Sequence, residues 1–184
     1  ISKIKRSVNS KDLPNVYLLN GEFTDKEMND LYNHPKVKAM VTTTKGEGFG
    51  RPLLEFSTSG KPIIASGWSG HLDFLNPSFT TLLKGHLENV HPATANNWLV
   101  QESKWFQVDG THLRQSLKDV FKKYKVHSVK GKQQKQYVKS NFSWEKMSGL
   151  IHSKLDKALV MNPIPKQVEL SLPELNLPKL TKIN

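Results

Sequence analysis

Residues 47–55 read EGFGRPLLE and predict a glycine-rich turn that leads into a helix. Gly48 and Gly50 lack a Cβ, so the backbone can take a positive φ and bring its N–H groups close to a ligand. Pro52 suits the first turn of a helix, where its missing N–H is not needed. A diphosphate is expected at this helix N-terminus, because free N–H groups there attract anions. The glutamates at the two ends can accept hydrogen bonds from hydroxyl groups on either side of the phosphates, so the stretch favours a sugar nucleotide as ligand.

Four short apolar runs surround this stretch and predict β-strands. They are Val16–Leu19, Val37–Val41, Ile63–Ser66 and Thr80–Leu83. Such runs are typical of parallel strands that are buried on both faces, and strands that alternate with helices predict a covered parallel sheet. The expected fold class is therefore α/β, a Rossmann-like parallel sheet with helices on both faces. Ligands of such sheets bind at the carboxyl ends of the strands, where the loops 20–23, 42–50 and 66–71 should open.

Capping residues mark the ends of the expected helices. Thr24 and Glu27 form a capping box, in which the threonine oxygen accepts from the N3 amide while the glutamate reaches back. Pro35 closes that helix. The helix that starts near Pro52 should end at Gly60, which suits a left-handed cap.

The second half of the chain shows less regular patterning. We expect an irregular or partly helical insertion over residues 87–106, where proline, asparagine and aromatic residues mix. Asp109 and Ser143 then predict the N-caps of two helices. A basic helix is expected between them, over residues 126–139.

Two segments are expected along the chain. Residues 1–160 should form one partial nucleotide-sugar-binding domain that includes the C-terminal helices, and residues 1–12 should be a short amphipathic helix or a frayed lead-in. Residues 161–184 are rich in proline and leucine and predict an extended tail, for which docking on an apolar surface and disorder are both open.

Composition indicates an anionic partner and limits the chemistry. The net charge of +11 and the pI of about 9.7 favour nucleotide sugars, acidic glycans, lipid phosphates or nucleic acid as partners. The basic stretch 114–139 is either a solvated helix face or a site for a polyanion or a membrane surface. Cysteine is absent, which excludes disulfides and thiolate metal sites. Neither a leader nor a membrane-spanning run is seen, so a cytoplasmic location is expected, with peripheral contact to a membrane surface as a further option.

The stretch 47–55 resembles the glutamate–any seven–glutamate motif of retaining glycosyltransferases with the two-domain GT-B fold, particularly their large fourth family. The likeness continues through residues 59–66, which read SGKPIIAS, to Gly70 and an acid three residues later. Upstream, residues 15–21 read NVYLLNG and are similar to the family's strand that ends in a glycine near the nucleobase. The resemblance covers about residues 13–76 and implies the C-terminal, donor-binding half of a GT-B enzyme.

The resemblance assigns roles to particular residues. Glu47 would be the catalytic residue, holding hydroxyl groups of the donor sugar near the bond that breaks, and Glu55 would bind the ribose. The other expected donor-binding residues are Gly21, Gly48, Phe49, Gly50, Arg51 and Gly70. Backbone donors to the phosphates would come from Gly48, Phe49 and Gly50. Gly21 would let the base stack close to the backbone, or is a turn glycine that ends a strand. Arg51 could reach a phosphate oxygen or point outward.

Several neighbouring side chains have two readings each. Trp68 and His71 could line the sugar pocket, or could be a packing tryptophan and a solvated histidine. Lys45 and Lys61 could touch the donor but fit surface positions better. No Asp-x-Asp pair and no histidine spacing typical of a metal site is seen, so metal-free chemistry is expected.

The implied activity is transfer of a hexose from a nucleoside diphosphate sugar to a hydroxyl acceptor with retention of configuration, without a cofactor. The acceptor would be a glycan, a lipid-linked sugar or another hydroxyl compound. Residues 1–12 do not match the first strands and the basic residues of the family's domain, and its N-terminal domain has no counterpart. We therefore expect a chain that is truncated at its start and inactive without that domain. The alternatives are a non-catalytic basic module that binds nucleotides or, less favoured, nucleic acid, and an interaction fragment.

Overall fold

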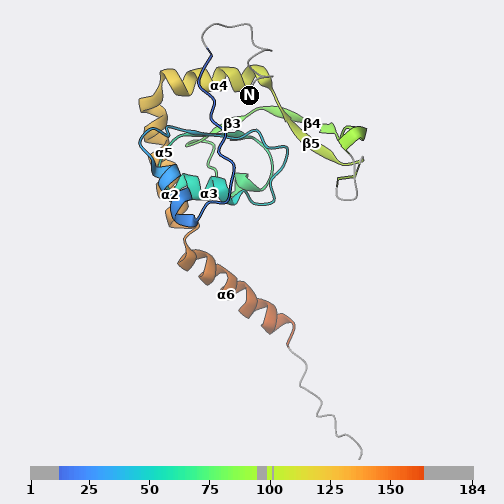
Figure 1. The fold of residues 1–184 in the computed structure, drawn as a ribbon. Coiled ribbons are helices and arrows are strands. Elements are labelled where there is room, and N and C mark those ends of the chain that lie inside the picture. Colours follow the sequence, from blue (N-terminus) through green and yellow to red (C-terminus); the bar gives the residue numbers. More distant parts are fainter. Residues whose placement is uncertain (1–12, 95–98, 101, 164–184) are drawn as a thin grey trace, which may run out of the picture. The chain divides into compact units, whose positions relative to one another are not determined.

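A computed structural model describes residues 13–94, 99–100 and 102–163 (Figure 1). The chain divides into two units, Ile1–Ser140 and Asn141–Asn184, and each is considered by itself. The expected lead-in over residues 1–12 lies outside the described residues. The same holds for nearly all of the expected tail over residues 161–184.

The centre of the first unit is a parallel sheet of three strands, in the order β1-β2-β3. The strands are β1 (Met40–Val41), β2 (Ile63–Ser66) and β3 (Thr81–Leu83). Met40 pairs with Ile63, and Ile64 pairs with Thr81. All four residues of β2 are buried, as expected for a middle strand that is covered on both faces. The expected α/β class with a parallel sheet is confirmed, although β1 is shorter than the run that predicted it.

Helices lie on both sides of this sheet. Figure 1 shows α4 (Gly110–Lys122) on one side, and α2 (Asp25–Asn33) and α3 (Arg51–Ser57) on the other. On the α4 side, Val120 packs with Ile64 and Leu83 in one buried cluster. Each such fully buried side chain stabilises the fold by roughly 1.5–3 kcal/mol relative to its exposed state.

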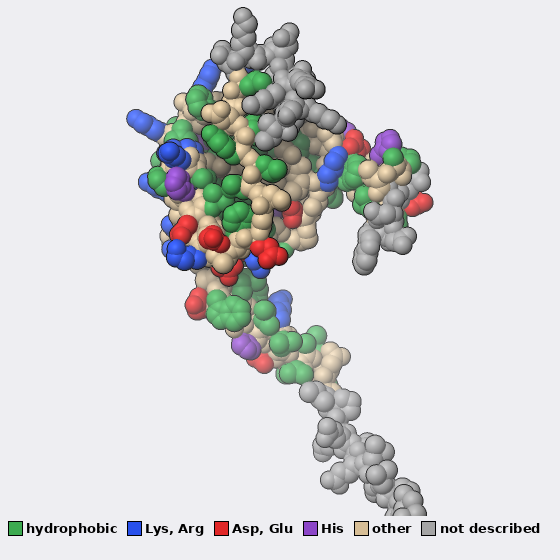
Figure 2. Space-filling model, viewed as in Figure 1, with side chains coloured by type: hydrophobic (Ala, Val, Ile, Leu, Met, Phe, Trp, Pro, Cys, Tyr) green, Lys and Arg blue, Asp and Glu red, His purple; other side chains and the backbone are tan. Residues whose placement is uncertain are grey.

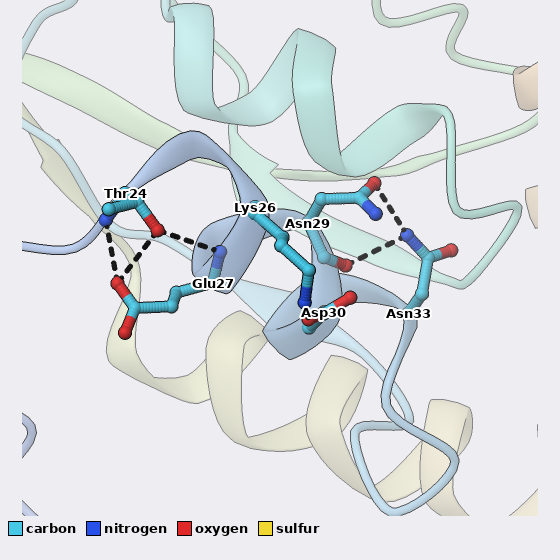
Figure 3. A network of polar contacts seen from close by, with 6 residues as sticks. All are labelled: Thr24, Lys26, Glu27, Asn29, Asp30 and Asn33. Atoms are coloured by element: carbon cyan, nitrogen blue, oxygen red, sulfur yellow. Dashed lines mark hydrogen bonds and ion pairs between the residues drawn. The ribbon is translucent and has the colours of Figure 1, made fainter.

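On the side of the sheet opposite α4, an aromatic contact joins α2 and α3, and hydrogen bonds cap both ends of α2. Tyr32 of α2 meets the ring of Phe56 of α3 edge-on, with ring centroids 5.4 Å apart. The capping box is confirmed: Glu27 N–H donates to Thr24 Oγ1 (3.3 Å) and Thr24 N–H donates to the Glu27 carboxylate (2.8 Å) (Figure 3). The hydrogen bonds that the N–H group and then the hydroxyl group of Thr24 donate to the Glu27 carboxylate lower the pKa of Glu27. At the other end of α2, Lys61 Nζ donates to the carbonyl oxygens of Tyr32 (2.6 Å) and His34 (2.7 Å), so Lys61 serves as a C-terminal cap.

The prediction of a strand at Val16–Leu19 is wrong. These residues belong to no strand, and Tyr17 and Leu18 are 82% and 77% exposed. A buried parallel strand needs a neighbouring strand and covering helices, and among the described residues β1 pairs with β2 alone. An apolar run by itself does not distinguish these two situations.

The prediction of an irregular or partly helical segment over residues 87–106 is wrong at its two ends, which are strands. The structure has an antiparallel pair here, β4 (Gly85–Asn89) and β5 (Lys104–Val108), with Leu87 opposite Phe106. A short 3₁₀ turn, Pro92–Thr94, lies in the connection. Antiparallel pairs are stabilised by cross-strand side-chain contacts, which a local reading of each segment does not reveal.

The expected basic helix is α5 (Tyr124–Asn141), and it packs through a glycine. A Cβ at Gly131 would lie 2.7 Å from the carbonyl oxygen of Gly60, so only a glycine allows this close approach. Gly60 itself has φ 74°, which confirms the expected left-handed turn after α3. On the face shown in Figure 2, Lys and Arg side chains project from the side of the molecule where α4 and α5 lie.

The described part of the second unit is α6 (Trp144–Met161), which starts at the expected cap. Ser143 Oγ accepts a hydrogen bond from Lys146 N–H at 3.3 Å. No residue of this helix is buried. In the part of the chain that the structure describes, no helix has the length and apolar character needed to cross a membrane.

Candidate functional site

Two loops meet at the carboxyl ends of β1 and β2, and we call residues 44–50 and 66–71 the loop pair. Ser69 Oγ accepts from Glu47 N–H (2.9 Å) and lies 2.6 Å from Glu47 O, to which it donates. Gly70 N–H donates to the same carbonyl oxygen at 3.0 Å. Three hydrogen bonds therefore fix the backbone of Glu47 against the second loop.

Glycines allow the loops to come this close. A Cβ at Gly70 would lie 2.0 Å from the carbonyl oxygen of Gly48 and 3.0 Å from that of Glu47. Gly50 has φ 86°, which confirms the positive φ expected of this turn, and a Cβ there would lie 3.0 Å from His71 Cβ. The close approach of the two loops therefore requires glycine at positions 50 and 70.

Ser69 holds a strained backbone conformation. Its φ of 88° and ψ of −171° fall in a region that is occupied almost entirely by glycine and that costs other residues roughly 1–3 kcal/mol. The two hydrogen bonds of its hydroxyl group with Glu47 help to maintain this conformation. Strain of this kind is typical of ligand-binding loops.

The loop pair leaves polar groups available for a ligand. The carboxylate of the half-buried Glu47 makes no hydrogen bond or ion pair within the described residues, and neither do the N–H groups of Gly48, Phe49 and Gly50. The Phe49 ring packs on Phe74, with centroids 5.1 Å apart. Four consecutive residues thus offer one carboxylate and three N–H groups that have no partner within the described residues.

The first turn of α3 offers few donors of its own. Pro52 has no N–H, and the N–H groups of Leu53 and Leu54 donate to the carbonyl oxygen of Gly50 at 2.9 Å and 3.2 Å. The free donors beside Glu47 therefore belong mainly to the glycine turn.

Glu55 lies in a different place, a groove of about 560 Å³ between α2 and α3. Phe23, Asn29 and Tyr32 line it from the α2 side, and Arg51 and Glu55 line it from α3, whereas Glu47 does not. The Nε of Arg51 lies 2.9 Å from Glu55 Oε1. Figure 3 shows Asn29 and Asn33 of α2 joined by hydrogen bonds from the Asn33 amide.

The groove changes the acidity of a tyrosine. Burial raises the pKa of Tyr32, the negative charge of Glu55 raises it further, and the positive charge of Arg51 opposes both. Among the described residues, no atom beyond its chain neighbours lies within 4 Å of the Cβ position of Gly21, which comes two residues before Phe23 at the groove.

The β4–β5 pair is attached to the loop pair. Phe106 N–H donates to the carbonyl oxygen of Lys45 at 2.8 Å. The Nζ of Lys45 lies 3.2 Å from Glu88 Oε1 and 4.3 Å from the centroid of the Trp105 ring. The hydrogen bond from Trp105 Nε1 and then that from Lys45 lower the pKa of Glu88. Lys45 is therefore engaged with the hairpin.

Two side chains of the second loop differ in burial. His71 is fully buried and its Nε2 donates to the carbonyl oxygen of Ser66 at 2.6 Å, so the solvated alternative for His71 is wrong. Trp68 stacks on Phe106 and remains 42% exposed, so it packs on the β4–β5 pair and still contacts solvent.

The structure thus brings Glu47, Gly48, Gly50 and Gly70 together, and places Arg51 and Glu55 in the neighbouring groove. Sequence reasoning missed Ser69, Trp105 and Phe106 as parts of this arrangement. A serine in a glycine-rich loop is a signal for side-chain hydrogen bonds to the backbone, but its partner in a distant loop is not visible from the sequence.

Neither a protein-family model nor a curated protein matches the sequence. Among the described residues, no group of three or more His, Cys, Asp or Glu side chains is placed to hold a metal ion.

Proposed function

We propose that this chain is the donor-binding part of a retaining, metal-independent hexosyltransferase of the GT-B type. It would bind a nucleoside diphosphate sugar and, with an N-terminal domain, transfer the hexose to a hydroxyl acceptor. The observation that carries the proposal is the loop pair, in which Glu47 has a fixed backbone, and in which its carboxylate and the next three N–H groups have no partner among the described residues. The Rossmann-like GT-B fold belongs to the same proposal.

Each part of the ligand has a complementary group. The carboxylate of Glu47 accepts hydrogen bonds from hydroxyl groups of the hexose. The free N–H groups of the glycine turn stabilise the negative charge that develops on the departing diphosphate, because they are already oriented before the reaction.

The groove between α2 and α3 takes the nucleoside, with Glu55 accepting from the ribose hydroxyl groups. Its volume of about 560 Å³ is within the range of ordinary small-molecule sites. Arg51 holds the Glu55 carboxylate in place and carries a positive charge close to the phosphates.

A second candidate is a basic module that binds nucleic acid. The observation in its favour is the charge of +11 together with the exposed Arg114, Lys118 and Lys122 on α4. This module would bind DNA or RNA with a steep dependence on salt concentration and would not respond to nucleoside diphosphates.

The test is a thermal-shift panel with UDP, GDP, ADP and their sugar derivatives. One of these nucleotides should stabilise the chain, by about 2.7 kcal/mol at a hundredfold excess over its Kd. Glu55→Gln should weaken binding of both the nucleotide and its sugar derivative about tenfold, since it removes a charged hydrogen-bond acceptor.

Glu47→Gln should weaken only the additional binding that the sugar provides. Asp156→Asn, an exposed carboxylate of α6, is the matched control and should bind like the parent chain. If no nucleotide raises the melting temperature, the proposed donor site is wrong.

A further inference from the structure

We propose that the open face of the Trp68 indole is a stacking platform for a pyranose ring. The platform rests on the proposed function, because it adds a sugar subsite beside the loop that holds the donor. It extends that function by assigning a sugar-binding subsite to an aromatic side chain.

The geometry of the ring gives the first argument. Trp68 and Phe106 are nearly parallel, with an interplanar angle of 11° and centroids 6.3 Å apart. Phe106 is only 7% exposed, whereas Trp68 is 42% exposed. A centroid separation of 6.3 Å between nearly parallel rings corresponds to an offset stack, so the largely buried Phe106 supports part of the indole while 42% of Trp68 stays exposed to a ligand.

The support beneath Trp68 is built for this ring. A Cβ at Gly85 would lie 2.6 Å from Cζ of Phe106, so the absence of a side chain at Gly85 makes room for the phenyl ring. The backbone of Phe106 is in turn bonded to Lys45 of the first loop. Phe106 is therefore fixed within β5, and its ring supports the indole of Trp68.

The backbone on both sides of Trp68 is also fixed. Gly67 N–H donates to Leu83 O at 2.9 Å, and a Cβ at Gly67 would lie 2.8 Å from that oxygen. Ser69 on the other side is held in its strained conformation by Glu47. An aromatic face that is oriented before binding loses little entropy when a ligand stacks on it.

The neighbouring chemistry favours a sugar as the occupant. The C–H bonds on one face of a pyranose ring carry slight positive charge and face the negative surface of an aromatic ring favourably. The hydroxyl groups at the ring edge need acceptors, and the unpartnered carboxylate of Glu47 belongs to the residue that Ser69, next to Trp68 in the chain, binds. The groove at Glu55, which suits the nucleoside, is lined by neither Trp68 nor Glu47.

The experiment follows the indole N–H signals of the four tryptophans by two-dimensional NMR of the 184-residue chain. The signal missing in Trp68→Phe identifies Trp68. Methyl glucoside, galactoside and mannoside are titrated alone, and then the nucleoside diphosphates and their sugar derivatives. We expect at least one of the sugar-containing probes to shift the Trp68 signal.

Two arms distinguish the source of the sugar. A shift with free glycosides while nucleoside diphosphate is saturating indicates an acceptor sugar on the platform. A shift with the sugar nucleotide, but with neither the free glycoside nor the nucleotide alone, indicates the donor hexose. Both results support the platform.

Variants test whether the aromatic face binds the sugar. Trp68→Ala should weaken the affinity for that probe about tenfold, whereas Trp68→Phe should retain most of it. Trp144→Ala in α6 is the control and should change nothing. Melting temperatures of all variants confirm that each remains folded.

The platform is wrong if no sugar, free or nucleotide-linked, shifts the Trp68 signal, or if Trp68→Ala binds the sugar as well as the parent chain does. A shift by nucleotides without sugar would assign the face to a nucleobase and would equally contradict it. Nucleotide stabilisation without any effect at Trp68 would contradict the platform and leave the proposed donor function intact. Glycoside binding at Trp68 without nucleotide stabilisation would support the platform and contradict the proposed donor function.

Discussion

The two glutamates of one nine-residue motif are held in opposite ways. Glu47 has a backbone fixed by three hydrogen bonds from a second loop and a carboxylate without a partner in the described chain. Glu55 lies on a regular helix, and its carboxylate is paired with the exposed Arg51 at 2.9 Å. The position of Glu47 therefore depends on long-range contacts, whereas that of Glu55 depends on local helix geometry. Substitutions around the loop pair should consequently have larger effects on stability than those at the groove.

The largest effect is expected for Gly70→Ala. The new Cβ would lie 2.0 Å from Gly48 O and 3.0 Å from Glu47 O, and both contacts are with backbone, which cannot move aside without separating the loops. Overpacking of this kind should lower the free energy of unfolding by about 3 kcal/mol, measured by urea denaturation.

Gly48→Ala is the matched control for that substitution. Beyond its chain neighbours, no atom of the described residues lies within 4 Å of the Cβ position at Gly48, so the free energy of unfolding should change by less than about 0.5 kcal/mol. Equal stability of the two variants would show that the loops do not meet as described.

A smaller effect is expected at Ser69, where two substitutions separate hydrogen bonding from strain. Ser69→Ala loses the bonds to Glu47 and keeps a side chain at φ 88°, so it should destabilise the fold by about 2 kcal/mol. Ser69→Gly loses the same bonds but relieves the strain, and should be about 1 kcal/mol more stable than Ser69→Ala. Thermal and urea unfolding measure both, and the opposite order would argue against a strained Ser69.

At the groove, Arg51→Gln should reduce stability by only about 0.2–0.5 kcal/mol. The ion pair with Glu55 is an exposed pair on one helix, four residues apart, and such pairs are weak and screened by salt. Urea denaturation at low and high salt measures this. A loss as large as that of Ser69→Ala would remove the contrast between the two regions.

The smallest effect is a change in the titration of Tyr32. Burial and then the charge of Glu55 raise its pKa, so Glu55→Gln should move that pKa back toward its ordinary value, with unpaired Arg51 acting in the same direction. Absorbance titration of the tyrosines, with Tyr32→Phe to identify the signal, follows the change.

The same shift has a defined consequence for stability. Because the folded-state pKa of Tyr32 is raised, its contribution is fully present below the unfolded value near 10 and is lost as the pH rises through the folded value. Unfolding measured at increasing alkaline pH should therefore show a smaller loss in Glu55→Gln than in the parent chain. No difference between them would indicate that Glu55 does not face Tyr32.

Local signals in the sequence were sufficient for much of the fold. The capping box at Thr24, the cap at Asp109 and the strand Ile63–Ser66 were predicted at the positions where the structure has them, because each depends on residues within a few positions. The strand at Val16–Leu19 failed because its apolar run has no neighbouring strand in the described chain.

The candidate site was predictable in its residues and not in its connections. The glycine turn could be read from residues 47–55, including the positive φ of Gly50. The bonds between Ser69 and Glu47 and the stacking of Trp68 on Phe106 join segments that are distant in the sequence, and local propensity carries no information on such pairs.

The attachment of β5 to the first loop also affects the order in which the molecule assembles. The cap of α2 joins residues three positions apart, the loop pair joins residues 22 apart, and the contact of Lys45 with Gln107 spans 62 positions. Closing a longer loop loses more chain entropy, so contacts between residues of larger sequence separation form later on average. We therefore expect the helices to form early, and we expect Trp68 to acquire its support from Phe106 only after β5 has docked on the first loop.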